Sequence, residues 1–214
     1  MQLDPASSPE GIEKRSFDII DSEFPEPRPF EGHLWEVARR IIHTTGDTGI
    51  AGDLRLSAAG CAAGIQALRQ GCTVYTDTEM ARCGIPVRRT SRLGVSVISL
   101  MSLPFSAEAK AAGMTRARAG MLALKTKLAG NIVAIGNAPT ALLALLDILN
   151  EGAEPPALII GMPVGFVNAA QSKELLAASP WPNFTLLGRK GGSPLAAACV
   201  NALAEIALRT GHTA

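Results

Sequence analysis

The chain has 214 residues, of which 47% are hydrophobic and 18% charged, with a formal net charge of +1. This length is enough for one large domain or two small ones, and the near balance of charge argues against a nucleic-acid or membrane partner. The apolar runs are short and the first residues lack the apolar segment of a signal peptide, so we expect a cytoplasmic protein without a membrane span.

Four cysteines are spread along the chain without the C-x-x-C spacing or the nearby histidines of a zinc site. They are Cys61, Cys72, Cys83 and Cys199. We expect them to be small buried hydrophobes in a reducing compartment, with no disulfide and no bound metal.

The first predicted helix starts at Pro9, where Ser8 can act as the N-cap, and runs to about Glu23. Its apolar positions are Ile12, Phe17, Ile19 and Ile20. Residues 1–7 before it are predicted to be a loose tail and residues 210–214 a frayed end. Residues 8–209 then form a single domain.

A proline-rich connector separates this helix from a second one, which ends near His43. The apolar residues of the second helix follow helical spacing and form one stripe: Leu34, Val37, Ala38, Ile41 and Ile42. His43 falls on the opposite side of the helix from that stripe, which argues against a buried core histidine.

Gly46 can supply a left-handed cap after His43, and Thr44, Thr45 and Asp47 offer hydrogen-bond partners to the imidazole. Two interpretations stay open at this point. His43 is either a solvated histidine whose charge favours the helix dipole, or a general acid.

From residue 57 onward, short β-branched strands alternate with helices. Strands are predicted at residues 73–77, 95–100, 131–136, 157–160 and 184–187. Helices are predicted at residues 57–70, 78–83, 106–112, 115–128, 141–150, 168–178 and 193–209, with loops at 46–56 and 88–92. Continuous apolar strands of this kind indicate a doubly wound, mainly parallel sheet of about five strands, covered on both faces.

Three of the strand-to-helix turns, at residues 136–140, 161–165 and 189–193, are rich in glycine and polar residues. Such turns lie at the carboxyl ends of strands, where open α/β sheets bind ligands, and exposed N–H groups there attract anions. Ordinary helix caps explain any one of the turns, but three together favour a polar, anionic ligand. None matches the glycine fingerprint of a dinucleotide site or a P-loop.

Eight arginines could pair with carboxylates in a bidentate manner, although we expect at least half of them to be merely solvated. They are Arg15, Arg40, Arg88, Arg89, Arg92, Arg116, Arg118 and Arg189. Arg40 lies one helical turn before His43, and Arg116 begins a predicted helix.

Six segments, in this order, resemble the precorrin-8X methylmutase family, which includes the cobalt-precorrin-8 methylmutases. They are RSFDII at 15–20, IIHTTGD at 41–47, TR at 115–116, GNAPTAL at 136–142, GMPVGFV at 161–167 and GGS at 191–193. The resemblance covers residues 9 to 205 approximately, and its two long Gly-Pro motifs are specific.

The resemblance implies a flavodoxin-like, three-layer α/β/α fold and a homodimer with active sites near the subunit interface. The implied reaction belongs to cobalamin biosynthesis and moves a methyl group from C-11 to C-12 of the macrocycle in a [1,5]-sigmatropic shift. Precorrin-8X would give hydrogenobyrinate, or cobalt-precorrin-8 would give cobyrinate. No cofactor is expected, and neighbouring pathway enzymes are possible transient partners.

By motif position, the resemblance implies that His43 is the catalytic general acid, a role typically worth about 10²–10⁴ in rate. It implies substrate binding by Ser16, Arg15, Arg40, Arg116, Thr115, Asn137, Thr140, Gly191, Gly192 and Ser193. A precorrin carries many carboxylates, which fits dispersed arginines and amide-rich turns without a large net positive charge.

Two other functions stay open on the sequence. A corrinoid carrier without turnover is favoured by two departures from the family pattern, at Leu103 and Ala117. A flavodoxin-like binder of phosphate or nucleotide could instead use the 189–193 turn.

Overall fold

The computed structural model describes residues 8–210, and its centre is one sheet of six strands in the order β1-β6-β5-β4-β2-β3. The strands are β1 Leu54–Leu56, β2 Thr73–Thr76, β3 Ser96–Ser99, β4 Ile132–Ile135, β5 Leu158–Gly161 and β6 Asn183–Leu186. All neighbours are parallel except β1, which runs antiparallel to β6 at the edge. The mainly parallel sheet is confirmed, with one strand more than predicted.

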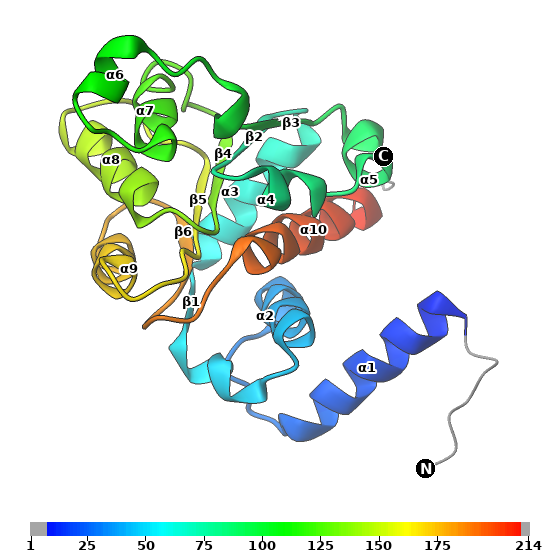
Figure 1. Cartoon of the computed structure of the whole chain (residues 1–214). Helices are drawn as coiled ribbons and strands as arrows, with labels where there is room; N and C mark the ends of the chain where they lie inside the picture. Colours follow the sequence, from blue (N-terminus) through cyan, green and yellow to red (C-terminus); the bar gives the residue numbers. More distant parts are fainter. Residues whose placement is uncertain (1–7, 211–214) are drawn as a thin grey trace.

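Helices cover both faces of the sheet, which confirms the three-layer α/β/α architecture (Figure 1). The helices are α1 Pro9–Glu23, α2 Gly32–Thr45, α3 Ala58–Arg69, α4 Glu79–Cys83, α5 Val87–Thr90, α6 Ala107–Ala111, α7 Arg116–Leu122, α8 Pro139–Asn150, α9 Ala169–Ala177 and α10 Ser193–Thr210. Short 3₁₀ turns lie at η1 Thr48–Asp53, η2 Ser91–Leu93 and η3 Leu100–Ser102. No helix among residues 8–210 is long and apolar enough to cross a membrane.

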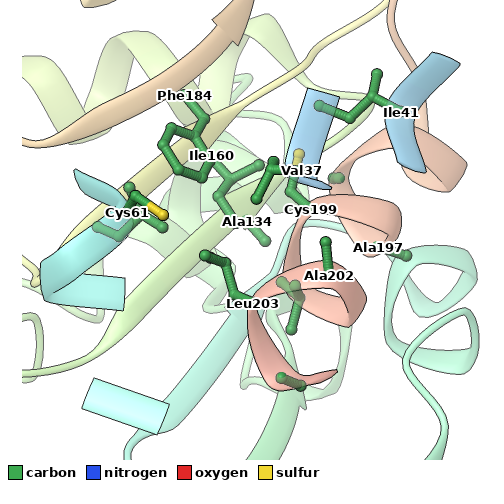
Figure 2. Packing of buried hydrophobic residues seen from close by; sticks show 14 of the residues in the cluster. Val37, Ile41, Cys61, Ala134, Ile160, Phe184, Ala197, Cys199, Ala202 and Leu203 are labelled. Atoms are coloured by element: carbon green, nitrogen blue, oxygen red, sulfur yellow. The ribbon is translucent and has the colours of Figure 1, made fainter. Parts of the chain in front are cut away.

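Each face of the sheet has its own hydrophobic core. In β4, Ile132 and Ala134 pack under α2, α3 and α10, whereas Val133 and Ile135 pack under α7 and α8. This alternation follows from the two-residue period of a strand, and a strand buried on both faces must be apolar throughout. Figure 2 shows the first core, where β-strand residues such as Ile160 meet α10.

Helix α1 lies at the edge of the molecule (Figure 1) and packs against α2. Asp21 holds the pair together, because it accepts hydrogen bonds from Trp35 Nε1 at 2.8 Å and from Arg39 Nη1 at 2.6 Å. Of the apolar positions predicted for α1, Ile20 is buried, whereas Ile12 and Ile19 remain more than half exposed.

Several predicted boundaries were wrong. The loops predicted at 46–56 and 88–92 contain η1, β1, α5 and η2, and the helix predicted at 115–128 ends at Leu122. β1 has only three residues, and its pairing with β6 is a tertiary contact without a local sequence signal. Cys83 is exposed, although the other three cysteines are buried and all four are free. The predicted tail at 1–7 and residues 211–214 lie outside the described residues.

Candidate active site

His43 lies in the last turn of α2, and its side chain is exposed although Ile41 and Ile42 beside it are buried. Gly46 closes the helix in a left-handed conformation, with φ of 62°, and its N–H donates to the Ile42 carbonyl at 2.9 Å. The predicted phase of His43 and the predicted cap are both confirmed.

The His43 hollow is a depression of about 290 Å³ between α1 and the end of α2. Its lining consists of Ser16, Ile19, Ile20, Glu23, Ile42, His43, Gly46 and Thr48. Phe17 meets the imidazole edge-on, with ring centroids 5.4 Å apart, and so restricts its tilt. The structure therefore brings Ser16 and His43 to the same hollow.

The expected hydrogen bonds from neighbouring side chains to His43 are absent from the described residues. Thr44 Oγ1 donates to the Arg40 carbonyl at 2.8 Å, and Thr45 Oγ1 donates to the Ile42 carbonyl at 2.9 Å. Asp47 caps η1 by accepting from Gly49 N at 2.9 Å. Threonines in a last helical turn commonly bond back to carbonyls of that helix, which leaves both imidazole nitrogens open to a ligand.

Arg40 is buried and lies in a second cavity, the arginine cleft, rather than in the His43 hollow. Its guanidinium pairs with Glu13 at 2.9 Å and with Glu205 at 2.6 Å, and Glu205 also pairs with Arg89. The hydrogen bond from Arg40 lowers the pKa of Glu13 below its ordinary value, against burial, which raises it. A substrate carboxylate would compete with Glu13 and Glu205 for Arg40.

The arginine cleft has a volume of about 750 Å³. It is lined by Glu13, Phe17, Glu36, Arg39, Arg40, Arg88, Arg89, Arg92, Glu205, Leu208 and Arg209. Phe17 is its wall toward His43, since the Arg39 and Arg40 guanidinium carbons lie 4.5 and 5.2 Å from the ring centroid. Arg15, by contrast, is exposed on α1.

Asp77, at the end of β2, organises the carboxyl edge of the sheet, and sequence reasoning missed it. Its carboxylate accepts backbone N–H bonds from Gly136 at 2.9 Å, Asn137 at 2.7 Å and Ala138 at 2.7 Å. Burial raises the pKa of Asp77, and the three N–H groups act in the opposite direction. An acidic residue directly after a buried strand is the signal that could have found it. The side chain of Asn137 points to solvent from this fixed turn.

The glycine turns pack backbone against backbone. A Cβ on Gly136 would lie 2.5 Å from Ser193 Cα, and one on Gly191 would lie 2.3 Å from the Met162 carbonyl oxygen. Gly192 N donates to that carbonyl at 2.8 Å, and Ser193 Oγ lies 2.8 Å from Thr78 Oγ1. The three turns predicted at the carboxyl edge therefore do come together.

Thr115 and Thr140 also meet, with their hydroxyl oxygens 2.9 Å apart. Thr115 is the N-cap of α7 and accepts from Arg118 N at 3.2 Å. Arg116 donates from Nη2 to the Met101 carbonyl at 2.9 Å, which holds its guanidinium near the start of α7.

An exposed ion pair joins the carboxyl edge to the His43 region. Lys190 Nζ lies 2.6 Å from Asp47 Oδ2, four residues beyond His43. The hydrogen bond from Lys190 lowers the pKa of Asp47. The His43 hollow and the arginine cleft are lined by different predicted residues, and neither lining includes the turns of the carboxyl edge. The structure therefore places the predicted residues in three groups: the His43 hollow, the arginine cleft and the carboxyl edge.

The two departures from the family pattern pack into the second core. Ala117 is buried, and Leu103 is partly buried against the same cluster. Neither lines the His43 hollow. No group of three or more His, Cys, Asp or Glu side chains suited to a metal ion is found in the described part of the chain.

A family model described as precorrin-8X methylmutase matches residues 11–206. The cobalt-precorrin-8 methylmutase of Salmonella typhimurium is 41% identical over 203 residues, covering 91% of this chain and 94% of that protein. The precorrin-8X methylmutase of Pseudomonas aeruginosa is 40% identical over 197 residues, with coverage of 91% and 94%.

A crystal structure of precorrin-8X methylmutase from Thermus thermophilus superposes with a TM-score of 0.86 at 39% identity. The match covers 96% of this chain and all of that one. The likeness therefore extends over the three layers of the fold and all three groups of predicted site residues.

Proposed function

The chain belongs to the precorrin-8X methylmutase family and is an isomerase of cobalamin biosynthesis, and we propose that His43 is the general acid of its methyl shift. The observation that carries this proposal is the state of the imidazole. It is exposed in the His43 hollow, its tilt is restricted by Phe17, and neither nitrogen is hydrogen-bonded to a described residue.

In the proposed mechanism, the His43 imidazolium donates a proton to the conjugated macrocycle and so polarises it. The bond from the methyl group to C-11 breaks as the bond to C-12 forms, and His43 recovers its proton when the product is complete. The reaction is an isomerisation, so it consumes no oxidant or reductant. We expect the proton donor to contribute about 10²–10⁴ in rate, or about 3–5 kcal/mol of the barrier.

Substrate binding by the other predicted residues is part of the same proposal. Ser16 lines the hollow with His43, and the hydroxyls of Thr115 and Thr140 form a pair at the start of α7. Asn137 and the Gly191–Ser193 turn present polar groups on a backbone that Asp77 and Met162 hold in place. Carboxylates around a macrocycle would find Arg15, Arg40 and Arg116 as cationic partners.

We further propose that the chain works in the cytoplasm as a homodimer, with possible transient contacts to neighbouring pathway enzymes. The support for a dimer lies on α1, where Ile12 and Ile19 are 56% and 53% exposed. Ile19 also lines the His43 hollow, so an apolar surface that excludes water on pairing would border the proposed active site.

The amount of substrate converted per subunit distinguishes an enzyme from a non-catalytic carrier. Precorrin-8X or cobalt-precorrin-8 is incubated with a small fraction of its molar amount of protein, and the visible spectrum is followed. We expect many turnovers. A spectral change that stops at one equivalent per subunit would establish the carrier. The two departures from the family pattern that favoured a carrier, Leu103 and Ala117, pack into the second core and do not line the His43 hollow.

The role of His43 is tested by comparing His43→Ala with His33→Ala. His33 is also exposed on α2, but it pairs with Glu36 at 3.0 Å in the first turn. We expect His33→Ala to turn over normally, and His43→Ala to bind the macrocycle without converting it. Normal turnover by His43→Ala would exclude it as the acid.

A further inference from the structure

The GMPVGFV segment at 161–167 carries the most exposed large hydrophobic side chain of the described residues. Phe166 is 84% exposed, and Val167 and Val164 beside it are 77% and 43% exposed. The segment follows β5 at the carboxyl edge of the sheet, which is the position where open α/β sheets bind their ligands. The predicted binding residues do not include any of these three side chains.

The backbone that leads into Phe166 is held by hydrogen bonds to the 188–193 segment. Gly165 N donates to the Arg189 carbonyl at 3.1 Å, and Gly192 N donates to the Met162 carbonyl at 2.8 Å. Lys173, which is fully buried in α9, donates to the Lys190 carbonyl at 2.6 Å. The 161–167 and 188–193 segments are thus fastened to each other, which fixes the backbone from which the Phe166 side chain projects.

Cationic groups lie behind and beside the ring. The Arg189 guanidinium carbon is 5.3 Å from the Phe166 centroid, within the range of a cation–π contact. The next residue, Lys190, reaches Asp47 near the end of α2. The Phe166 ring therefore has the Arg189 guanidinium against it, and Lys190, the next residue along the chain, links this segment to the region of His43.

We propose that the exposed face of Phe166, flanked by Val164 and Val167, stacks against the conjugated macrocycle of the substrate, with Arg189 and Lys190 placed to meet its carboxylates. This inference rests on the proposed function. A planar, apolar ring system with anionic arms is complementary to an aromatic face bordered by cations. The 188–193 segment fastened beside Phe166 carries Gly191, Gly192 and Ser193, which are predicted to bind substrate, and this favours the macrocycle over a second chain as the occupant of the surface.

The test is equilibrium binding of hydrogenobyrinate, followed by its visible absorbance, to the intact protein. We expect Phe166→Ala to raise Kd about tenfold, equivalent to about 1.4 kcal/mol. Phe166→Trp should restore binding because it keeps a π face, whereas Phe166→Leu should recover it only in part. Met80→Ala is the matched control, because Met80 is 68% exposed on α4 and should leave Kd unchanged. The loss in Phe166→Ala should persist at high salt, which screens ion pairs but not stacking.

Sedimentation of the free variants completes the test. A tenfold loss of affinity with an unchanged molecular mass supports the proposal. An unchanged Kd in Phe166→Ala overturns it, and so does a loss of affinity accompanied by a change of mass, because the ring would then belong to a contact between copies. If the wild-type protein neither binds nor converts the macrocycle, the proposed function fails as well. If the wild type binds the macrocycle and Phe166→Ala binds it with the same Kd, only the proposal that Phe166 stacks on the macrocycle is overturned.

Discussion

We expect Gly136→Ala both to destabilise the fold and to displace the turns at the carboxyl edge of the sheet. The added Cβ would lie 2.5 Å from Ser193 Cα, 2.7 Å from Ser193 N and 2.9 Å from Gly192 C. Because all three are backbone atoms, no side-chain rotation relieves the overlap. The segments that carry Gly136 and Ser193 must therefore separate by about 1 Å to reach ordinary carbon–carbon contact. Overpacking of this kind costs about 1–3 kcal/mol, and we expect the upper half of that range.

The stability change is measured by urea unfolding with thermal unfolding beside it. A loss of about 2–3 kcal/mol lowers Tm by about 4–12 °C for a chain of this size. A displacement of about 1 Å at a binding site can reduce kcat/KM by about 100-fold, so the activity of the folded variant should fall steeply. Gly52→Ala is the matched control, since a Cβ there meets nothing within 4 Å. If the two variants differ by less than about 0.5 kcal/mol, the close packing at Gly136 is not as described.

Three further outcomes follow from the geometry. Glu205→Ala removes one of the two partners of buried Arg40 and should cost about 2–3 kcal/mol in urea unfolding, somewhat below the usual value for breaking a buried pair because one partner remains. Thr115→Val removes the N-cap of α7 and should lower stability by about 1 kcal/mol, whereas Thr115→Ser should keep it. Burial lowers the pKa of Lys173 from 10.5 to about 8. The unfolded chain therefore binds more protons between these values, and the stability of the wild type relative to Lys173→Met should rise as pH increases from about 8 to 10.5. A flat or falling difference would contradict the burial of this amine.

The elements with strong local signals were predictable. Ser8 and Ser57 begin helices as N-caps, and Gly46 ends one in the left-handed conformation. The exposure of His43 followed from its phase on α2 alone. The parallel sheet followed from apolar strands that alternate with helices, because such strands need helices on both faces.

Other features depend on contacts that local pattern does not encode. β1 forms only because β6 offers a free edge. The partners of Arg40 come from residues 27 positions before it and 165 after it, so its burial had no local signal. The threonines near His43 were expected to face the imidazole, but back-bonding within α2 takes their hydroxyls. Asp77 was passed over because a lone carboxylate after a strand resembles a solvated loop residue until its three N–H donors are known.

A single-turnover rate decides whether His43 supplies a proton to the bound macrocycle. His43→Ala is mixed in excess over the substrate so that all of it is bound, and the appearance of rearranged product is timed with and without added imidazole. We expect the step to be about 10²–10⁴ slower than in the wild type and to recover in part with imidazole. A rate within a few-fold of the wild type would contradict the assignment of His43 as the general acid.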